Sequence, residues 1–561
     1  MIKYSLPQFR NKFATLLYIG FLLTTIHCAN QALPPGGPID TEPPYIVATY
    51  PHANTLNYKS NKFHFEFNEY VERRSFEDAV FISPANIIRP KFRWSAKKVD
   101  VILPYEFDDN KTYSITIGTD VFDVNNKNRM AQAYTLAFST GDHIDTFYIS
   151  GKVFDDKSSG YLVVAYRINE FNQDTLNPCM VYADYTTQTG EDGRFVLKNL
   201  AEGKYRIFTI RDEYKNLLYD QGIDKIGSYW EDINIDSNKI AVHNVFIKTC
   251  LEDTASFKLL DVESVDINHI SIRLNRNIDI SSLLPNFATI SDTATRKKLD
   301  IINYSIDEAK ANRIKLLTGE MTNSTYFLTL HSIKDSIGNT IDSTGNNYLF
   351  VGSIESDTIR PAITRISLSD SMINYCPIDP VRVDINKIID TSHFKNSVSL
   401  MTDSVNILFD ICFHNNSHVT ISSNHLLYNK WYRLIIPKNA LISHNFLYNQ
   451  DSVIVNFRTE ERPSVTAISG IVDSEEPYII EATSDKNVKY KTKVQENKSF
   501  KLDNIKEGRY TLFLFNDADS NSVYTNGKIN PYKKPEKFYY FPDTLKVKAS
   551  WPLEDVIIKV P

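Results

Sequence analysis

The chain has little glycine for its length, with 19 residues in 561. Loops that cradle phosphate and the sharp turns that expose a nucleophilic serine need glycine at defined positions. The sequence contains no G-x-S-x-G, no G-x-x-x-x-G-K-[ST] and no H-E-x-x-H pattern. These absences exclude the common signatures of serine hydrolases, nucleotide-binding enzymes and zinc proteases, so we predict that the protein is not an enzyme.

Long apolar runs and basic stretches are also missing. The apolar segment from Phe13 to Ile26 has about 14 residues, whereas a transmembrane helix needs about 20. The net charge is -6 and no Arg-rich run occurs, so nothing supports a nucleic-acid partner. The 42% hydrophobic and 23% charged residues are typical of folded domains. With 561 residues the chain needs several cores, and its 32 Tyr and 32 Phe favour strands.

The N-terminus has the pattern of an export signal. The apolar segment is preceded by basic residues at Lys3, Arg10 and Lys12. The run Leu23-Thr24-Thr25-Ile26-His27-Cys28 resembles the lipobox of bacterial lipoproteins. This resemblance implies that residues 1-27 are a signal peptide and that Cys28 becomes the lipid attachment site. His27 departs from the small residue usual before the cysteine, and an ordinary signal peptide with an incidental cysteine is the alternative.

Residues 28-40 form a Pro/Gly tether in this interpretation. Pro34-Pro35-Gly36-Gly37-Pro38 suits neither a helix nor a central strand, so the segment would hold the first domain away from the lipid. Ala29-Asn30-Gln31-Ala32 lacks the acidic residues that resemble a surface-export signal in related lipoproteins. We therefore expect a protein lipid-anchored to the outer membrane, at the periplasmic face rather than the cell surface. Its partner would be an unknown envelope protein or glycan.

The first domain, residues 41-143, shows the pattern of a β-sandwich. Phe63, Phe65 and Phe67 alternate with polar residues, which is the period of a half-buried strand. Further short strands follow at intervals of about 8–12 residues, as in sandwich folds.

Several motifs in order carry a family resemblance. They are Pro34 to Pro44, Phe65-Glu66-Phe67-Asn68-Glu69-Tyr70-Val71, Thr112-Tyr113-Ser114-Ile115 and Phe138-Ser139-Thr140-Gly141-Asp142. With Cys28 they resemble the Ig-like domain lipoproteins of the Bacteroidetes, whose first domain is a bacterial Ig-like module also seen in surface-layer proteins. The resemblance is strongest over residues 28–250. It implies fold and location, and no established molecular function.

A second type of domain occurs twice, at residues 144-249 and 463-561. The copies match without a gap at an offset of 305 residues, from Phe195/Phe500 through Tyr205/Tyr510 to Gly222/Gly527. Turns and strands alternate as in an antiparallel pair, and the pattern resembles the carboxypeptidase-regulatory, prealbumin-like sandwich. That module accompanies catalytic domains, so the resemblance implies no peptidase activity. We expect Phe195 to superpose on Phe500 and Tyr205 on Tyr510.

Residues 250-356 and 357-462 are predicted to be two degenerate Ig-like domains. Each has a late strand with a tyrosine, at Tyr326 and Tyr432. The predicted fold class is therefore all-β: serial β-sandwich domains after a lipoprotein signal peptide, in the order Ig-like, prealbumin-like, Ig-like, Ig-like, prealbumin-like. Modules in series would make a rod.

Four cysteines remain after Cys28. They are Cys179, Cys250, Cys376 and Cys412. An exported protein can pair an even number of cysteines, but these spacings match no known disulfide framework. Two alternatives therefore remain: two disulfide bonds, or four separate buried thiols.

Asp212, Asn216 and Asp220 form a candidate calcium site. Their 1, 5, 9 spacing in a loop can supply several of the oxygens that Ca²⁺ requires. Tyr214 occupies the position where a further ligand would be expected. The second copy has Asp517, Asp519, Asn521 and Thr525 here. Because Thr525 offers no carboxylate, we expect no calcium effect in the second copy. The alternative is a polar turn in which Asp and Asn bond their own backbone.

A thiol and three imidazoles near residue 412 suggest a second metal hypothesis. Cys412, His414, His418 and His425 have ligand types that suit Zn²⁺, and a turn after His414 would return His418 opposite it. A hairpin with exposed imidazoles is the alternative.

Four tryptophans offer a different kind of site. If their side chains are exposed, they could bind sugars or peptides, and if they are buried, they would pack in domain cores. The four residues are Trp94, Trp230, Trp431 and Trp551.

These features leave three hypotheses for function. The first is a non-enzymatic cell-envelope lipoprotein acting as a structural or interaction module. The second is an accessory lipoprotein that binds glycan or peptide ligands, which an exposed aromatic cleft would favour. The third is an unrecognised hydrolase, which would require clustered carboxylates with perturbed pKa values in a deep pocket.

Overall fold

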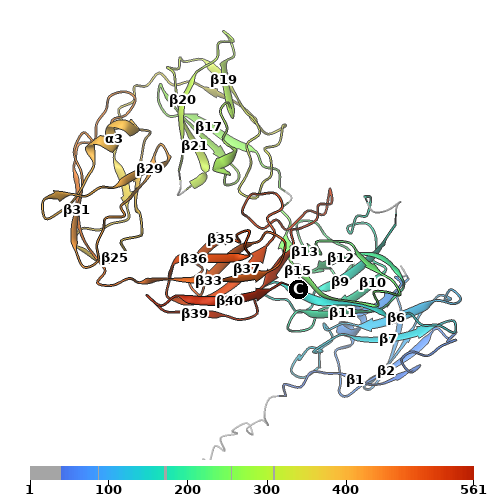
Figure 1. Cartoon of the computed structure of the whole chain (residues 1–561). Coiled ribbons are helices and arrows are strands. Elements are labelled where there is room, and N and C mark those ends of the chain that lie inside the picture. Colours follow the sequence, from blue (N-terminus) through green and yellow to red (C-terminus); the bar gives the residue numbers. More distant parts are fainter. Residues whose placement is uncertain (1–39, 86–87, 170–173, 254, 308–309, 561) are drawn as a thin grey trace, which may run out of the picture.

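The computed structural model describes residues 40–85, 88–169, 174–253, 255–307 and 310–560. Strands contain 47% of the residues and helices 3%. The strands form five two-sheet sandwiches in chain order, so the predicted all-β class of serial β-sandwiches is confirmed (Figure 1). Within the described ranges, no helix has both the length and the apolar character needed to cross a membrane.

The first sandwich packs a β1-β2-β5-β4 sheet on a β3-β6-β7 sheet. Its elements are β1 (Ile46–Tyr50), β2 (Lys62–Phe67), α2 (Arg73–Asp78), β3 (Val80–Ser83), β4 (Lys91–Ser95), β5 (Lys98–Ile102), β6 (Thr112–Ile117) and β7 (Tyr134–Ser139). Phe63, Phe65 and Phe67 are buried while the polar residues between them are partly exposed, so the predicted alternation is confirmed. Helix α2 adds Phe76, whose ring centroid lies 5.7 Å from that of Phe67.

The second and fifth sandwiches share one topology. The second contains β8 (Phe147–Phe154), β9 (Leu162–Ile168), β10 (Tyr185–Gln188), β11 (Arg194–Leu200), β12 (Gly203–Ile210), β13 (Lys225–Ser228), β14 (Ile233–Ile235), β15 (Ala241–Lys248) and β16 (Cys250–Leu251). The fifth contains β33 (Val465–Asp473), β34 (Ile479–Ser484), β35 (Lys489–Lys493), β36 (Ser499–Lys506), β37 (Gly508–Phe515), β38 (Phe538–Tyr540), β39 (Leu545–Val547) and β40 (Leu553–Lys559). The β11-β8-β15 sheet of one corresponds to the β36-β33-β40 sheet of the other.

The internal repeat predicted from the offset of 305 is confirmed by strand register. Phe195 pairs with Gly151 on β8, and Phe500 pairs with Gly470 on β33. Tyr205 and Tyr510 each donate their hydroxyl to the carbonyl four residues earlier, at 2.8 Å and 2.7 Å. Equal strand register and an equal tyrosine contact therefore underlie the ungapped match.

Glycine at Gly151 and Gly470 is required by a close approach of backbone. A Cβ at either position would lie 1.9 Å from a carbonyl oxygen, that of Val245 or Val556. Each of these carbonyls follows a bulge residue with positive φ in the parallel neighbour strand. The Ile-Ser-Gly motif that opens each copy thus has a packing cause.

The third and fourth sandwiches lie between the two copies. The third contains β17 (Leu259–Ser264), β18 (His269–Leu274), η1 (Ile280–Ser282), β19 (Ala288–Asp292), β20 (Ile301–Asp307), β21 (Lys310–Thr318), β22 (Thr325–Leu330) and β23 (Asn347–Val351). The fourth contains β24 (Ile363–Ile366), β25 (Met372–Tyr375), β26 (Val381–Ile385), α3 (Thr391–Ser397), β27 (Ser399–Thr402), β28 (Val405–Asn406), β29 (Asp410–Asn415), β30 (His418–Ser422), β31 (Trp431–Ile436) and β32 (Val453–Thr459).

One tyrosine marks the same strand in the first, third and fourth sandwiches. Tyr113, Tyr326 and Tyr432 are all buried, on β6, β22 and β31. The hydroxyl of each accepts a backbone N–H from the preceding loop, at 3.0, 3.0 and 2.8 Å. The shared contact makes β6, β22 and β31 equivalent strands, and it supports the Ig-like interpretation of the two degenerate domains.

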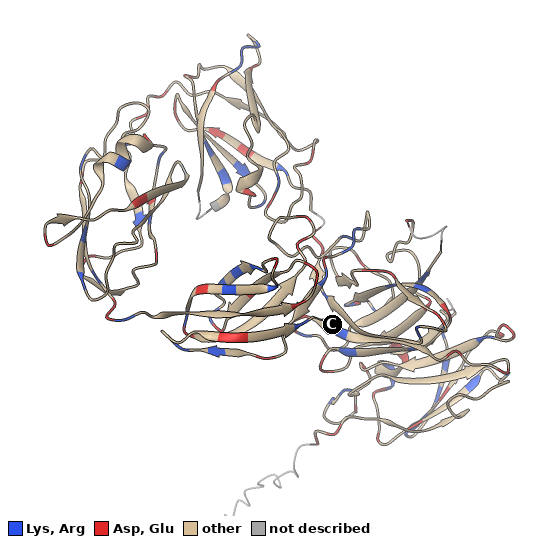
Figure 2. Ribbon diagram, in the orientation of Figure 1, with Lys and Arg blue, Asp and Glu red and all other residues tan. Residues whose placement is uncertain are grey.

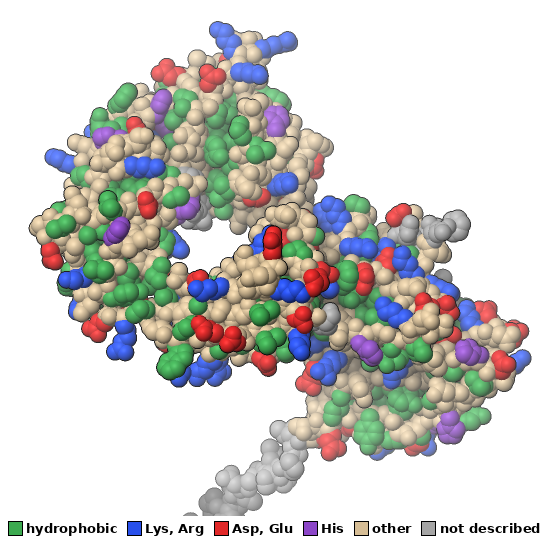
Figure 3. All heavy atoms as spheres, viewed as in Figure 1, with side chains coloured by type: hydrophobic (Ala, Val, Ile, Leu, Met, Phe, Trp, Pro, Cys, Tyr) green, Lys and Arg blue, Asp and Glu red, His purple; other side chains and the backbone are tan. Residues whose placement is uncertain are grey.

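The chain does not form the rod that modules in series suggested. After the fourth sandwich it folds back, and the fifth sandwich lies against the second (Figure 1). Buried side chains of both sandwiches belong to common hydrophobic clusters. The space-filling view shows an opening between the third, fourth and fifth sandwiches (Figure 3). The arrangement is therefore closed, because apolar side chains of the second and fifth sandwiches pack together.

Both signs of charge occur on every sandwich, without a large region of one sign in this view (Figure 2). This distribution agrees with the near balance of 62 basic and 68 acidic residues.

Candidate interfaces and polar sites

The predicted calcium loop follows β12 and is held by its own backbone. The Asp212 carboxylate accepts the N–H groups of Asn216 and Leu217 at 3.2 Å and 2.8 Å. The Asn216 side chain donates to the Asp220 carboxylate at 2.8 Å. The structure therefore brings Asn216 and Asp220 into contact, while Asp212 serves the turn. Calcium binding by these three residues stays a prediction.

A fourth carboxylate that sequence analysis missed supports this loop. Asp224 is fully buried and accepts the N–H groups of Glu213 and Asp220, at 3.1 Å and 2.8 Å. In the second copy Glu536 accepts the N–H groups of Ala518 and Thr525, at 2.8 Å and 2.9 Å. These are the same two positions at the offset of 305. Burial raises the pKa of both carboxylates.

The loop of the second copy gathers more carboxylates than the first. Asp517, Asp519 and Glu536 each place one oxygen within 4.8 Å of the others. The nearby Asp519 and Asp517 charges add to burial in raising the pKa of Glu536. Thr525 donates its hydroxyl to Asp519 at 3.2 Å. Glu536 thus supplies an acidic group that the comparison of aligned positions did not reveal.

The residues of the zinc hypothesis lie on and beside a hairpin. The predicted turn is confirmed, because β29 and β30 are antiparallel and the His414 and His418 ring centroids are 5.5 Å apart. His418 contacts the Asp384 carboxylate at 2.5 Å, and His414 contacts the Thr420 hydroxyl at 3.0 Å. Cys412 is exposed, and the His425 N–H bonds to a serine hydroxyl. Zinc binding stays a prediction.

The cysteines have separate surroundings. Cys179, Cys250, Cys376 and Cys412 are all free thiols in the structure. Burial raises the pKa of the Cys250 thiol to about 11. Cys28 lies outside the described residues.

The four tryptophans divide into two packed and two exposed side chains. Trp94 packs edge-on against Phe76 at 5.3 Å, and Lys537 lies over the Trp230 ring at 5.2 Å. Trp431 is 49% exposed and Trp551 is 76% exposed. The exposed pair offers the larger free aromatic surface to a ligand.

An aromatic interface joins the fifth sandwich to the second. Phe154 of β8 stacks on Tyr540 with centroids 4.7 Å apart and meets Phe538 edge-on at 5.7 Å. Phe246 of β15 belongs to the same cluster. Such ring pairs stabilise an interface beyond the apolar area that they bury. Sequence analysis missed this interface, because alternating aromatics look alike whether they face a core or a neighbouring domain.

A lysine is partly buried in the same interface. The Lys248 ammonium lies 4.7 Å from the Phe513 ring centroid and 4.8 Å from that of Tyr524. Burial lowers the pKa of Lys248. The two ring faces offer the cation electrostatic attraction in place of water.

A loop insertion completes the contact between the second and fifth sandwiches. The Tyr229 N–H donates to a carbonyl of β12, and the Phe541 N–H donates to the equivalent carbonyl of β37. These two residues are 312 positions apart, which is seven more than the offset of 305 between the copies. The extra residues lie in the segment 526–536, which we call the docking loop. Its Ile529 is buried in a cluster of the second sandwich.

Tyr532 and Ile529 anchor the docking loop. The Arg206 guanidinium lies 4.0 Å from the Tyr532 ring centroid. Glu252 accepts the Ile529 N–H at 2.7 Å and the Tyr219 hydroxyl at 2.8 Å. The loop therefore binds both the second sandwich and the segment that leaves it.

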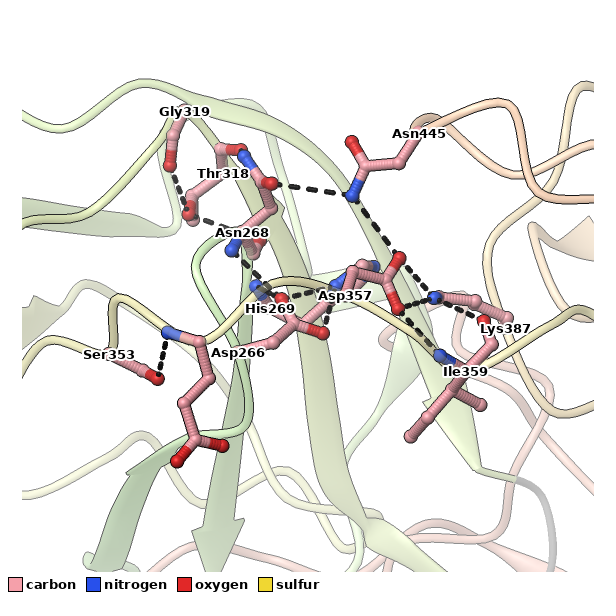
Figure 4. Close-up of polar contacts among 11 residues, drawn as sticks. Asp266, Asn268, His269, Thr318, Gly319, Ser353, Asp357, Ile359, Lys387 and Asn445 are labelled. Carbon is pink, nitrogen blue, oxygen red and sulfur yellow. Dashed lines mark hydrogen bonds and ion pairs between the residues drawn. The ribbon is translucent and has the colours of Figure 1, made fainter.

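A buried polar cluster joins the third and fourth sandwiches (Figure 4). The Asp357 carboxylate is fully buried and forms an ion pair with the buried Lys387. Asn445 bridges the two sandwiches by donating to Asp357 at 3.2 Å and to Asn268 at 3.4 Å. Lys387 also donates to the Ile359 carbonyl at 2.8 Å. The centre of the junction is therefore polar, and its buried carboxylate and ammonium groups are paired by an ion pair and hydrogen bonds.

The same junction contains metal-ligand residue types. Asp266, His269 and Asp357 each offer an atom within 4.8 Å of the others, and His269 contacts Asp266 at 2.8 Å (Figure 4). A divalent cation there would have to displace the Lys387 ammonium from Asp357. The geometry therefore suits an interdomain hydrogen-bond network better than a metal centre.

The first sandwich docks on the second through an uncharged sheet face. The outward residues of β3, β6 and β7 are Phe81, Ser83, Thr112, Ser114, Thr116, Thr135, Ala137 and Ser139. Strand β10 lies against β3 and β6, and the Thr186 N–H donates to the Ser83 hydroxyl at 3.2 Å. Apart from Thr135 these outward residues are buried.

Comparison with known proteins places one of these domains in a family. Residues 40–140 match the model of the bacterial Ig-like domain. The chain contains a bacterial Ig-like domain. This confirms the Ig-like interpretation of the first domain, while the narrower resemblance to Bacteroidetes lipoproteins stays a prediction. No curated protein matches the chain in sequence.

Solved structures with similar architecture are distant. The N-terminal part of the bacterial S-layer protein SbsC is 11% identical, with a TM-score of 0.18 over 36% of this chain and 44% of that chain. This chain therefore spans less than half of that structure. Domains MG0-NIE-MG1 of Escherichia coli alpha-2-macroglobulin are 10% identical, with a TM-score of 0.16 over 46% and 94%. Sidekick-1 immunoglobulin domains 1–4 are 10% identical, with a TM-score of 0.18 over 75% and 96%.

Proposed function

We propose that the protein is a non-enzymatic lipoprotein of the cell envelope that acts as a structural or interaction module. The observation that carries the proposal is the closure of the chain, in which Phe154, Phe246 and Tyr532 fix the fifth sandwich on the second. A closed set of sandwiches presents its surfaces in fixed relative positions, which suits a scaffold. The N-terminal pattern supports attachment through Cys28 at the periplasmic face of the outer membrane.

Metabolic labelling with a fatty-acid probe tests the anchor. We expect label on the wild-type protein and none on Cys28→Ser, with Cys412→Ser as the matched control that keeps the label. Several acyl chains on one cysteine give stable membrane binding, so Cys28→Ser should also move to the soluble fraction. Equal labelling of all three proteins would refute the lipid at Cys28. Protease treatment of intact cells separately distinguishes the periplasmic face of the outer membrane from the cell surface, because a periplasmic protein is protected from the protease.

Binding of a glycan or peptide is the second candidate function. The fifth sandwich carries Trp551, 76% exposed, and a hollow of about 400 Å³ with polar lining residues. Those polar residues are Ser469, Thr492, Gln495, Ser499, Lys501 and Asp555. We expect calorimetry with envelope glycans to show binding that Trp551→Ala or Ser499→Ala weakens and Trp94→Phe leaves unchanged. Absence of heat with the wild type across the panel would eliminate glycan binding.

A further inference from the structure

A lysine, an aspartate and an asparagine converge at the junction of the third and fourth sandwiches (Figure 4). Asp357 lies in the segment that enters the fourth sandwich, Lys387 follows β26, and Asn445 lies in the loop between β31 and β32. The side chain of Asp357 is 0% exposed and that of Lys387 is 7% exposed. A single oxygen of Asp357, Oδ2, accepts hydrogen bonds from Lys387 Nζ and from Asn445 Nδ2, the latter at 3.2 Å. An amine and a side-chain amide are therefore held against one shared carboxylate.

The backbone brings the lysine and the asparagine to the same place. Ile389 and Ser443 form an antiparallel bridge. Lys387 lies two residues before one side of this bridge, and Asn445 lies two residues after the other side. In an antiparallel pair, positions related in this way are neighbours on one face. The convergence of the two side chains on Asp357 agrees with this register.

The third sandwich has different groups at the equivalent place. Its corresponding bridge joins Ile278 to Asp335, and the residues two positions from it are Arg276 and Ile337. Arg276 forms an ion pair at 2.5 Å with Asp253, in the segment that enters this sandwich. A guanidinium stays charged and isoleucine has no amide, so these side chains cannot react with each other. The fourth sandwich keeps an ion pair with the entering segment, but its lysine and asparagine are groups that can react.

We propose that Lys387 and Asn445 become joined by an isopeptide bond, with Asp357 as the catalytic carboxylate. Lys387 Nζ first gives a proton to Asp357 along their hydrogen bond, which leaves a neutral amine as the nucleophile. The Asn445 amide then turns its oxygen toward the protonated carboxyl, which donates a hydrogen bond to it and polarises the amide carbon. Because the three groups are already in contact in a buried site, the reaction needs no encounter between molecules.

The reaction balances without a co-reactant. Lys387 Nζ attacks Cγ of Asn445 and forms a new C–N bond, and the bond between Cγ and Nδ2 breaks. The leaving nitrogen takes two protons that began on the lysine ammonium and were relayed by Asp357. It departs as ammonium, and Asp357 returns to its carboxylate form. The product is one amide that links the two side chains.

The bond ties the segment after β26 to the loop before β32, at the end of the fourth sandwich that contacts the third. A covalent link between distant residues restricts the unfolded chain, as a disulfide does. The sandwich would thereby resist unfolding without any cysteine pair. The inference goes beyond the envelope role and does not depend on a lipid at Cys28.

Peptide mass spectrometry of the full chain tests the bond. Trypsin does not cleave after a lysine whose amine is acylated, so the bond predicts one branched peptide composed of residues 383–395 and 439–458. Its mass should be lower than the sum of the two peptides by one ammonia. We expect this peptide from the wild type and its loss in Lys387→Arg and in Asn445→Ala. Lys395→Arg, which replaces an exposed lysine of α3, is the matched control and should retain it.

Two results for the wild type would overturn the proposal, and neither depends on the folding of a variant. One is recovery of residues 383–387 and 439–458 as separate peptides of unaltered mass. The other is loss of ammonia within 439–458 alone, which would indicate a succinimide at an asparagine. Asp357→Asn cannot relay protons and should yield the separate peptides, with circular dichroism to verify its fold; a linked peptide at the wild-type level would refute the catalytic role of Asp357. Cys28→Ser should give the same branched peptide as the wild type, so this outcome is separate from that of the lipid anchor.

Discussion

A single buried carboxylate organises the same loop in two Ig-like sandwiches. Asp123 accepts the N–H groups of Asn126 and Asn128, at 2.5 Å and 2.7 Å. Asp335 accepts the N–H groups of Ile337 and Asn339, at 3.1 Å and 2.8 Å. The fourth sandwich has Ser443 at this bridge position, and its hydroxyl accepts the Leu447 N–H at 3.2 Å. A short Asp is favoured because it reaches several amides of one turn at once.

Asp335 gives a pH-dependent contribution to stability. Burial alone would raise its pKa, but hydrogen bonds from Asn339 and the ion pair with Arg276 outweigh burial and hold the pKa below its ordinary value. The unfolded chain has a pKa of about 3.9 here. The folded protein thus binds fewer protons in this window, so the contribution is complete above that pH and is lost as pH falls through the folded pKa.

We expect Asp335→Asn to lower the unfolding free energy of the third sandwich by about 1–3 kcal/mol at neutral pH. The reason is that the amide replaces a charged acceptor and loses the Arg276 ion pair. Pulse proteolysis in urea, with cleavage sites mapped to residues 255–356, measures this at pH 7 and pH 3. The difference between variant and wild type should shrink at pH 3. Asp300→Asn, an exposed carboxylate of the same sandwich, is the control and should change neither value. An unchanged difference at pH 3 would contradict the assignment.

At the scale of elements, the docking loop is what distinguishes the two copies of the prealbumin-like unit. Strands β12 and β37 carry equivalent contacts, but only the second copy has the seven extra residues that present Ile529 and Tyr532. In the first copy the corresponding segment is residues 221–224, which is seven residues shorter. Two sandwiches of one topology therefore differ at their interface: the fifth inserts the side chains of its loop, and the second accommodates them.

The sequence predicted the internal repeat but not the contacts that the two copies make with each other. Spacing shows that Phe195 and Phe500 occupy equal positions, because strand and turn lengths are local properties. Spacing cannot show that Phe154 faces a neighbouring domain, since a strand alternates in the same way against any apolar surface. The equivalence of Glu536 and Asp224 was not predicted for a related reason. The insertion moves Glu536 seven residues beyond the position that the offset of 305 assigns to Asp224. The predicted core strands were thus recovered, whereas contacts between domains required the three-dimensional structure.

Removal of the Tyr532 side chain should loosen the fifth sandwich from the second. The ring contacts Phe208 with centroids 5.9 Å apart and stacks on Arg206, so Tyr532→Ala should weaken docking by about 2 kcal/mol. Small-angle scattering should show a larger radius of gyration, and proteolysis near residue 462 should accelerate. Tyr214→Ala, which removes an exposed ring from the segment that follows β12, should leave both unchanged. Identical scattering for the two variants would mean that the docking loop does not hold the interface.

At the scale of the whole molecule, weak polar contacts accompany the aromatic interface. Lys506 contacts Asp379 of the fourth sandwich at 3.3 Å, and Lys528 contacts Asn339 of the third at 3.1 Å. Exposed pairs of this kind contribute little and are screened by salt. The closed arrangement must therefore rest on the buried rings and on Glu252, and it should survive high ionic strength.

Cleavage of the chain between the fourth and fifth sandwiches tests this directly. Glu461 and Arg462 are exposed, so a protease site inserted between them is accessible in the folded protein. Because the fifth sandwich is held to the second by buried aromatics, the C-terminal fragment should co-elute with the remainder after cleavage, even in 1 M salt. The double variant Phe246→Ala/Tyr532→Ala should release the fragment, since it removes one ring from each side of the interface. Release of the wild-type fragment at low salt would show that only the covalent linker maintains the closed arrangement. Release at high salt alone would assign the closure to Lys506 and Lys528, and would thereby identify the ionic contacts as dominant over the aromatic ones.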